Sequence, residues 1–112
     1  MQFSTSTVLA AIAIFAGQTL AYCKPATMKG TSRACTTSDN IDWSCPDGTT
    51  IHNYNPDNNN EFIVTTKAKD AYINAFCTND FVDHLQVRCT AGLTDALTLP
   101  CGKDTARFFI NM

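Results

Sequence analysis

The sequence predicts an α+β fold, in which one helix packs on one face of a mostly antiparallel sheet of about five strands. Three observations predict this class: an even number of cysteines, several short segments that alternate apolar and polar residues, and one segment with the period of a helix. The chain of 112 residues is short enough to hold a single domain. We therefore expect a small domain that is cross-linked by disulfides.

Residues 1–21 are expected to be a cleavable export signal. An uninterrupted apolar run at 8–16 is followed by Thr19, Leu20 and Ala21, which place small residues before a cleavage point after residue 21. The apolar run is shorter than the roughly 20 residues of a transmembrane helix. We expect residues 22–112 to form one cysteine-rich domain that is secreted as a monomer, without a membrane anchor.

All six cysteines lie behind the predicted signal, which is typical of the disulfide framework of a secreted protein. Zinc binding is the alternative. The closest successive cysteines are nevertheless ten positions apart, and neither histidine stands at zinc-site spacing from a cysteine. We therefore expect disulfides and no metal, with the pairing left open. The cysteines are Cys23, Cys35, Cys45, Cys77, Cys89 and Cys101.

The start of the mature domain, 22–48, is rich in Thr, Ser, Asp, Gly and Pro. This composition favours loop with short extended pieces. Trp43 is the large apolar residue of the segment, and we expect it to anchor the segment on the core. The segment ends in Cys45-Pro46-Asp47-Gly48, a composition that favours a turn.

A hairpin is expected from 49–54 and 61–66, two runs rich in β-branched and aromatic residues that flank a polar loop. Asp57, Asn59 and Glu61 alternate oxygen-bearing side chains, as calcium ligands do. Asp and Asn also tolerate the backbone geometry of turns, so the plain turn is the favoured interpretation.

A helix is expected between Thr66, which can cap its start, and Asn79-Asp80, which can end it, because apolar residues recur there at the spacing of one helix face. Lys67 and Lys69, at its start, are expected to remain in solvent. Cys77 lies beside the apolar face, so its disulfide is expected to tie the helix to the sheet. The apolar face consists of Ala68, Ala71, Tyr72, Ala75 and Phe76.

Three further strands are expected after the helix. Segments 85–89 and 97–101 alternate apolar and polar residues, and 106–110 is rich in aromatic and aliphatic side chains. Pro100 cannot donate to a sheet ladder, so its strand should lie at an edge or end there.

The charge pattern argues against two classes of partner. The formal net charge is −2 at pH 7, and the eight Lys and Arg residues are scattered along the mature chain. No basic run could follow a nucleic-acid backbone or an anionic membrane surface. We therefore expect no nucleic-acid partner bound through a basic stripe.

One acid–base set could serve phosphodiester cleavage. In a ribonuclease-like site a carboxylate or imidazole takes a proton, a second imidazole protonates the leaving oxygen, and a guanidinium stabilises the charged phosphorane. The residues of this set would be His52, Glu61, His84 and Arg88. Side chains on the polar face of a sheet are the alternative interpretation, so no catalytic residue is assigned and no cofactor is expected.

A resemblance to the small secreted cysteine-rich proteins of filamentous fungi is carried by the leader MQFSTSTVLAAIAIFAGQTLA and by the mature start Tyr22-Cys23-Lys24-Pro25. Many proteins of that class are candidate effectors during colonisation of a host. In layout the chain also resembles ribonuclease-like and killer-toxin-like secreted scaffolds.

We expect a non-enzymatic, effector-like protein that binds a host or environmental target, which would be a protein or a glycan. A secreted ribonuclease-like enzyme is the first alternative. A toxin or antimicrobial against competing microbes is the second, although the net charge differs from that of basic membrane-active peptides.

Overall fold

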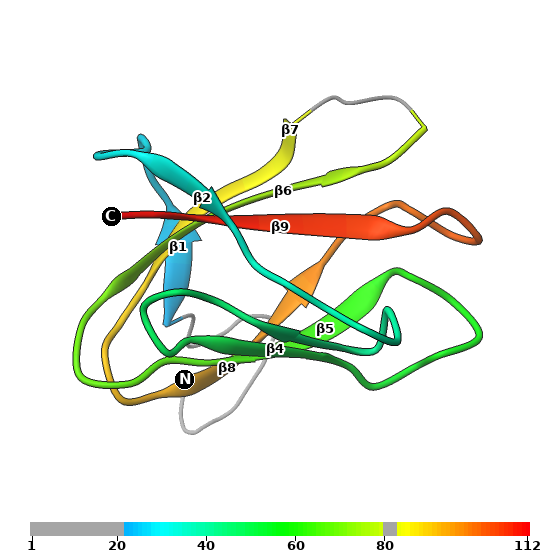
Figure 1. The fold of residues 1–112 in the computed structure, drawn as a ribbon, viewed down its shortest axis with the longest axis horizontal. Coiled ribbons are helices and arrows are strands. Elements are labelled where there is room, and N and C mark those ends of the chain that lie inside the picture. The colour runs from blue at the N-terminus through cyan, green and yellow to red at the C-terminus, as the bar shows by residue number, and fades with distance from the viewer. Residues whose placement is uncertain (1–21, 80–82) are drawn as a thin grey trace, which may run out of the picture.

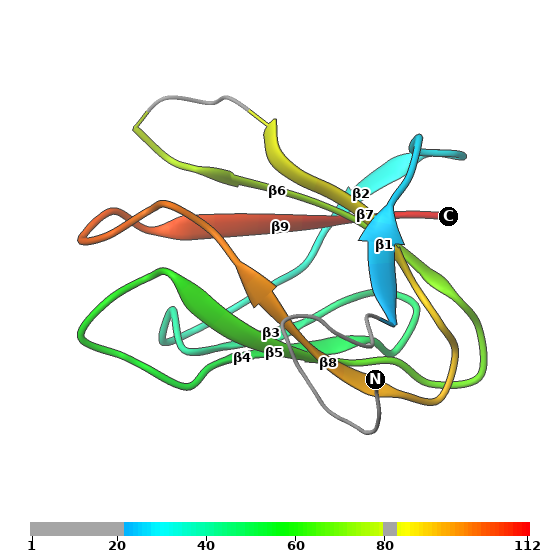
Figure 2. The same ribbon diagram turned by 180° about the vertical axis from the view of Figure 1, so that it is seen from behind.

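The computed structural model describes residues 22–79 and 83–112, apart from the side chain of Asp83. These residues form two antiparallel sheets that lie one above the other (Figures 1 and 2). The five-stranded sheet has the order β1-β7-β6-β9-β2, and the four-stranded sheet has the order β3-β4-β5-β8. The strands are β1 (Cys23–Pro25), β2 (Ser32–Ala34), β3 (Asp42–Ser44), β4 (Thr50–Asn53), β5 (Glu61–Thr65), β6 (Ala71–Cys77), β7 (Asp83–Cys89), β8 (Thr94–Thr98) and β9 (Ala106–Asn111).

The predicted helix is wrong, and with it the α+β class: the fold is all-β in the described ranges. Residues 71–77 form β6, which pairs with β7 on one side and with β9 on the other. Ala71, Ile73 and Ala75 are at most 1% exposed and face the core, while Tyr72 and Phe76 lie half-buried on the opposite face. Apolar residues on both faces of one strand imitate the spacing of a helix face.

Four of the other predicted strands are confirmed, the fifth is displaced along the chain, and all of them belong to a larger set than expected. β4 and β5 form the predicted antiparallel hairpin, in which Ile51 lies opposite Val64. β7 and β9 cover the predicted segments 85–89 and 106–110, and both strands belong to the five-stranded sheet. The strand expected at 97–101 is instead β8, which overlaps that segment only at 97–98. It lies at the edge of the four-stranded sheet and ends before Pro100, in keeping with the missing amide donor of that proline.

The segment 22–48 is confirmed as loop with short extended pieces. It contributes β1, β2 and β3, each of three residues. β1 pairs with β7 and β2 with β9, so this segment borders the five-stranded sheet on both sides. The predicted turn at 45–48 is also present, since the Gly48 amide donates to the Cys45 carbonyl at 3.0 Å.

Three aromatic rings join the two sheets. Trp43 of β3 is 2% exposed, which confirms that it anchors its segment on the core. Its ring meets those of Phe62 on β5 and Phe108 on β9 edge-to-face, with centroids 5.8 and 5.1 Å away, and the two phenyl rings are 5.0 Å apart. Such edge-to-face pairs add to the free energy gained by burying the rings.

All six cysteines form disulfides, as the sequence predicted. Cys23–Cys89 links β1 to β7 within the five-stranded sheet. Cys35–Cys45 and Cys77–Cys101 both connect a segment of the five-stranded sheet with one of the four-stranded sheet. Cys77 therefore ties one sheet to the other, and not a helix to a sheet. The disulfides are consistent with an extracellular protein.

The predicted export signal lies outside the described residues. Within the part of the chain that the structure describes, no helix has the length and apolar character needed to cross a membrane.

Candidate functional site

Two residues of the predicted acid–base set lie on the four-stranded sheet. His52 points outward from β4, and its Nδ1 lies 2.6 Å from Oδ1 of Asp42 on the neighbouring strand. Glu61 begins β5 on the same outer face, beside Tyr54. Burial and then the Glu61 carboxylate raise the pKa of the Tyr54 hydroxyl. His52 and Glu61 thus share a face, but each has a different neighbour.

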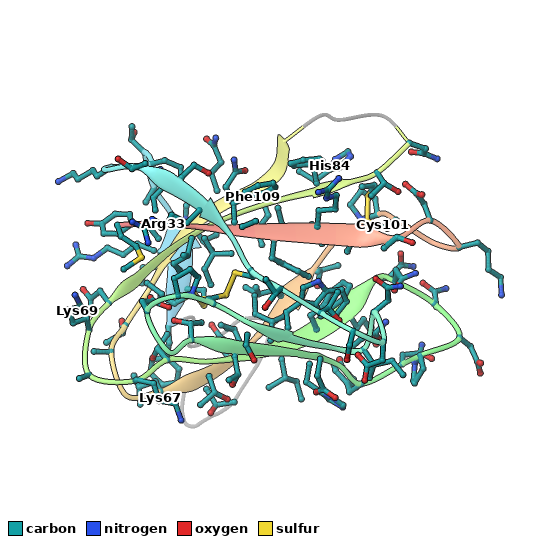
Figure 3. The ribbon with its side chains drawn as sticks, in the orientation of Figure 1. Arg33, Lys67, Lys69, His84, Cys101 and Phe109 are labelled. Atoms are coloured by element: carbon teal, nitrogen blue, oxygen red, sulfur yellow. A yellow bond between two sulfur atoms is a disulfide. The ribbon has the colours of Figure 1, made fainter. Side chains whose placement is uncertain are left out.

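The other two residues lie on β7 of the five-stranded sheet. Val87 and Cys89 of this strand face the core, whereas Arg88 is exposed on the outer face. Figure 3 places the His84 side chain, like that of Phe109, on the side of the five-stranded sheet that faces away from the four-stranded sheet. The sandwich therefore separates His84 and Arg88 from His52 and Glu61.

Hydrogen bonds of asparagine side chains fix the polar loop before β5. The Asn53 side chain donates to Asn59 Oδ1 at 2.9 Å, and Asn60 Oδ1 accepts from the Gly102 amide at 2.7 Å. The Asn59 amide also donates to the Gly102 carbonyl at 2.7 Å. These bonds favour the plain turn over a calcium loop, and no group of three or more His, Cys, Asp or Glu side chains with metal-site geometry occurs in 22–79 and 83–112.

One cavity lies beside the first half of β9, where the chain after β2 leaves the five-stranded sheet and crosses to the four-stranded one (Figure 1). Its volume is about 520 Å³, and Thr36, Thr37 and Asn40 form the polar wall opposite β9. Arg107 is the only side chain around it that carries a charge, among the residues described. This cavity offers no carboxylate or imidazole for acid–base catalysis.

A second cavity, here named the end cavity, lies at the end of the sandwich that holds the C-terminus in Figure 1. Its volume is about 250 Å³. Four segments far apart in the sequence meet there: the loop between β1 and β2, the turn before β4, the segment from the β5–β6 loop into β6, and the end of β9. The lining residues are Lys29, Gly30, Asp47, Lys69, Asp70, Tyr72, Asn111 and Met112.

The carboxylates of the end cavity already have partners. Asp70 Oδ2 accepts from Nε and Nη2 of Arg88 at 2.8 and 2.5 Å, and its Oδ1 accepts from the Ala91 amide at 2.8 Å. The Ala91 amide, and then Arg88, hold the pKa of Asp70 below its ordinary value. Asp47 Oδ1 accepts from the Thr49 amide at 2.9 Å.

The ammonium groups of the end cavity have no such partners. Among the residues that the structure describes, neither Lys29 nor Lys69 makes an ion pair or a hydrogen bond. Lys67 and Lys69 are both exposed, which confirms that they remain in solvent. Figure 3 shows Lys69 at this end of the molecule, where it lines the cavity. The cavity thus holds carboxylates that already accept hydrogen bonds and ammonium groups that have no partner among the described residues.

Sequence reasoning missed the end cavity because no motif marks it. Its residues are ordinary in type, and only the tertiary fold brings the four segments together. No family model, curated protein or solved structure matches this chain. We therefore base its function on the geometry of its own residues.

Proposed function

We propose that this protein acts outside the cell by binding a host or environmental target, without catalysis. The disulfides that link the two sheets support this proposal, because such bonds persist in an oxidising compartment. The resemblance of the leader and mature start to fungal secreted effector-like proteins makes a host-derived molecule the first target to test.

The end cavity is the observation that carries the proposal. It is a concave site in which two ammonium groups lack a protein partner, next to side chains that are already fixed by hydrogen bonds. Concave sites with a few convergent polar groups are where proteins bind small ligands and parts of larger ones. An anionic group of a target would supply the missing partner.

The ribonuclease alternative receives less support. Its four residues lie two by two on the outer faces of different sheets, with the buried core between them. A general base and a general acid must both lie within hydrogen-bond reach of the same reacting phosphodiester. His52 and His84 do not meet this requirement in the described fold.

An RNA-cleavage assay separates binding from catalysis. We expect the purified disulfide-linked protein to leave RNA intact, and the variants His52→Ala and His84→Ala to behave in the same way. Cleavage that either substitution abolishes would contradict the proposal.

A binding assay completes the test. On an array of extracellular glycans and peptides, we expect the intact protein to bind a defined subset. We expect the double variant Lys29→Met/Lys69→Met to lose that subset. Failure to bind any arrayed molecule, or binding that the double variant retains in full, would contradict the assignment of binding to the end cavity.

A further inference from the structure

The two kinds of charge in the end cavity restrict the chemistry of its ligand. Lys29 and Lys69 attract an anion, but Asp47 and Asp70 line the same cavity and repel one that carries several charges. Both carboxylates keep oxygen lone pairs beyond those used by their present donors. The favoured ligand therefore carries one negative charge together with groups that donate hydrogen bonds.

Asn111 adds a second requirement. Its Nδ2 donates to the Gly30 carbonyl at 3.4 Å, while its Oδ1 is buried without a donor in the protein. A buried acceptor without a donor lowers the stability of a fold unless water or a ligand donates to it. Sulfate, or phosphate in its fully ionised form, has no proton to donate, so neither of them meets this requirement.

Tyr72 and the size of the cavity add a third requirement. The half-buried Tyr72 ring lines the cavity, and the Arg88 guanidinium lies 5.7 Å from its centroid. A volume of about 250 Å³ lies below the range of pockets for drug-sized molecules, which begins near 300 Å³. One ring with an apolar face, several hydroxyl groups and a single carboxylate fits these limits.

We infer that the end cavity binds one uronate residue of an acidic polysaccharide. The carboxylate lies between the ammonium groups of Lys29 and Lys69, and ring hydroxyls donate to the Asp47 and Asp70 carboxylates. A small turn of the Asn111 side chain brings its Oδ1 within reach of a further hydroxyl. This inference rests on the proposed binding function and names the target class as an acidic glycan.

The test is a titration of the secreted, disulfide-linked protein with sodium galacturonate and sodium glucuronate, followed by amide chemical shifts. We expect saturable shifts at Gly30, Asp70 and Asn111. Lys29→Met and Lys69→Met should each raise the Kd about fivefold, the upper range for one exposed ion pair. Lys103→Met is the control, because it removes the same charge from the loop before β9, at the opposite end of that strand from the cavity, and it should change the Kd less than about twofold.

Several results would overturn the inference. These are uronate titrations without shifts at the end cavity, equal shifts with neutral galactose, tighter binding of inorganic phosphate than of uronate, or an effect of Lys103→Met as large as that of Lys69→Met. If the array identifies a neutral glycan or a peptide instead, the uronate assignment fails while the binding function stands. RNA cleavage with no arrayed target would remove the binding function itself.

Discussion

Replacing both cysteines of each disulfide with alanine separates the contributions of the three bridges to the free energy of unfolding. The bridges close loops of different lengths in the unfolded chain. The sequence separations are 66 for Cys23–Cys89, 24 for Cys77–Cys101 and 10 for Cys35–Cys45. A longer closed loop restricts the unfolded ensemble more, so its removal costs more stability.

The chain-entropy relation gives the size of each effect at 25 °C. It predicts losses of about 4.3 kcal/mol for the first bridge, about 3.4 kcal/mol for the second and about 2.7 kcal/mol for the third. Residue burial does not follow the same order, since Cys35, Cys45 and Cys101 are all 7–9% exposed and Cys23 is only partly buried. Cys77 and Cys89 are almost fully buried, so their replacement also leaves a small cavity.

Urea unfolding at pH 7, followed by tryptophan fluorescence of Trp43, measures these losses. The three double variants are compared with the parent protein, and the slope of the free energy against urea concentration is fitted separately for each. A loss for the Cys35–Cys45 variant that equals or exceeds the loss for the Cys23–Cys89 variant would refute the loop-length reasoning.

Three further predictions concern the backbone, the core and the pH dependence. Gly30→Ala places a Cβ against the carbonyl of Met112, at a residue with φ +83°. It should destabilise the fold more than Gly102→Ala, whose Cβ contacts no other residue at φ +60° and which should cost about 1–2 kcal/mol. Equal urea midpoints for the two variants would contradict this expectation. Phe108→Ala removes the ring shared by both sheets and should cost about 3–5 kcal/mol, whereas a loss like that of a surface residue would show that the aromatic cluster is not packed as described. Asp70 has a lowered pKa, so it stabilises the fold above its ordinary value of 3.8 and this contribution is lost as the pH falls through the lower folded value. Asp70→Asn should therefore be less stable than the parent at pH 7 and lose less stability on acidification; parallel acid-unfolding curves would contradict it.

The strands that the sequence predicted are those with local signals. The hairpin of β4 and β5 follows from two β-rich runs and a polar loop, and Pro100 marks the end of β8. The alternation of apolar and polar residues in β7 was sufficient because only one face of that strand is apolar. Such signals arise from residues that are close together in the chain, so they can be read from the sequence without knowledge of the tertiary fold.

β6 could not be recognised because its outer face is covered by distant residues. Phe76 stacks on Phe109 of β9 with ring centroids 5.4 Å apart, and Tyr72 lies against Arg88 of β7. These contacts allow apolar residues on both faces, and the alanines at 71 and 75 have high helix propensity. Tertiary packing then overrides the local preference for a helix.

The short strands and the sites depend on long-range contacts in the same way. β1 has three residues and is defined by its pairing with β7, where Cys23 lies opposite Cys89. The acid–base set shows that suitable residue types do not by themselves make a site. The sequence supplied His52 and His84 as suitable residue types, but only the strand order places them in different sheets.

Mapping of the disulfides in the natural protein tests the central structural claim most directly. Proteolysis without reduction, followed by mass spectrometry, should yield three cross-linked peptide pairs: Cys23 with Cys89, Cys35 with Cys45, and Cys77 with Cys101. A different pairing, or free thiols in the natural protein, would contradict the two-sheet sandwich and the extracellular function built on it.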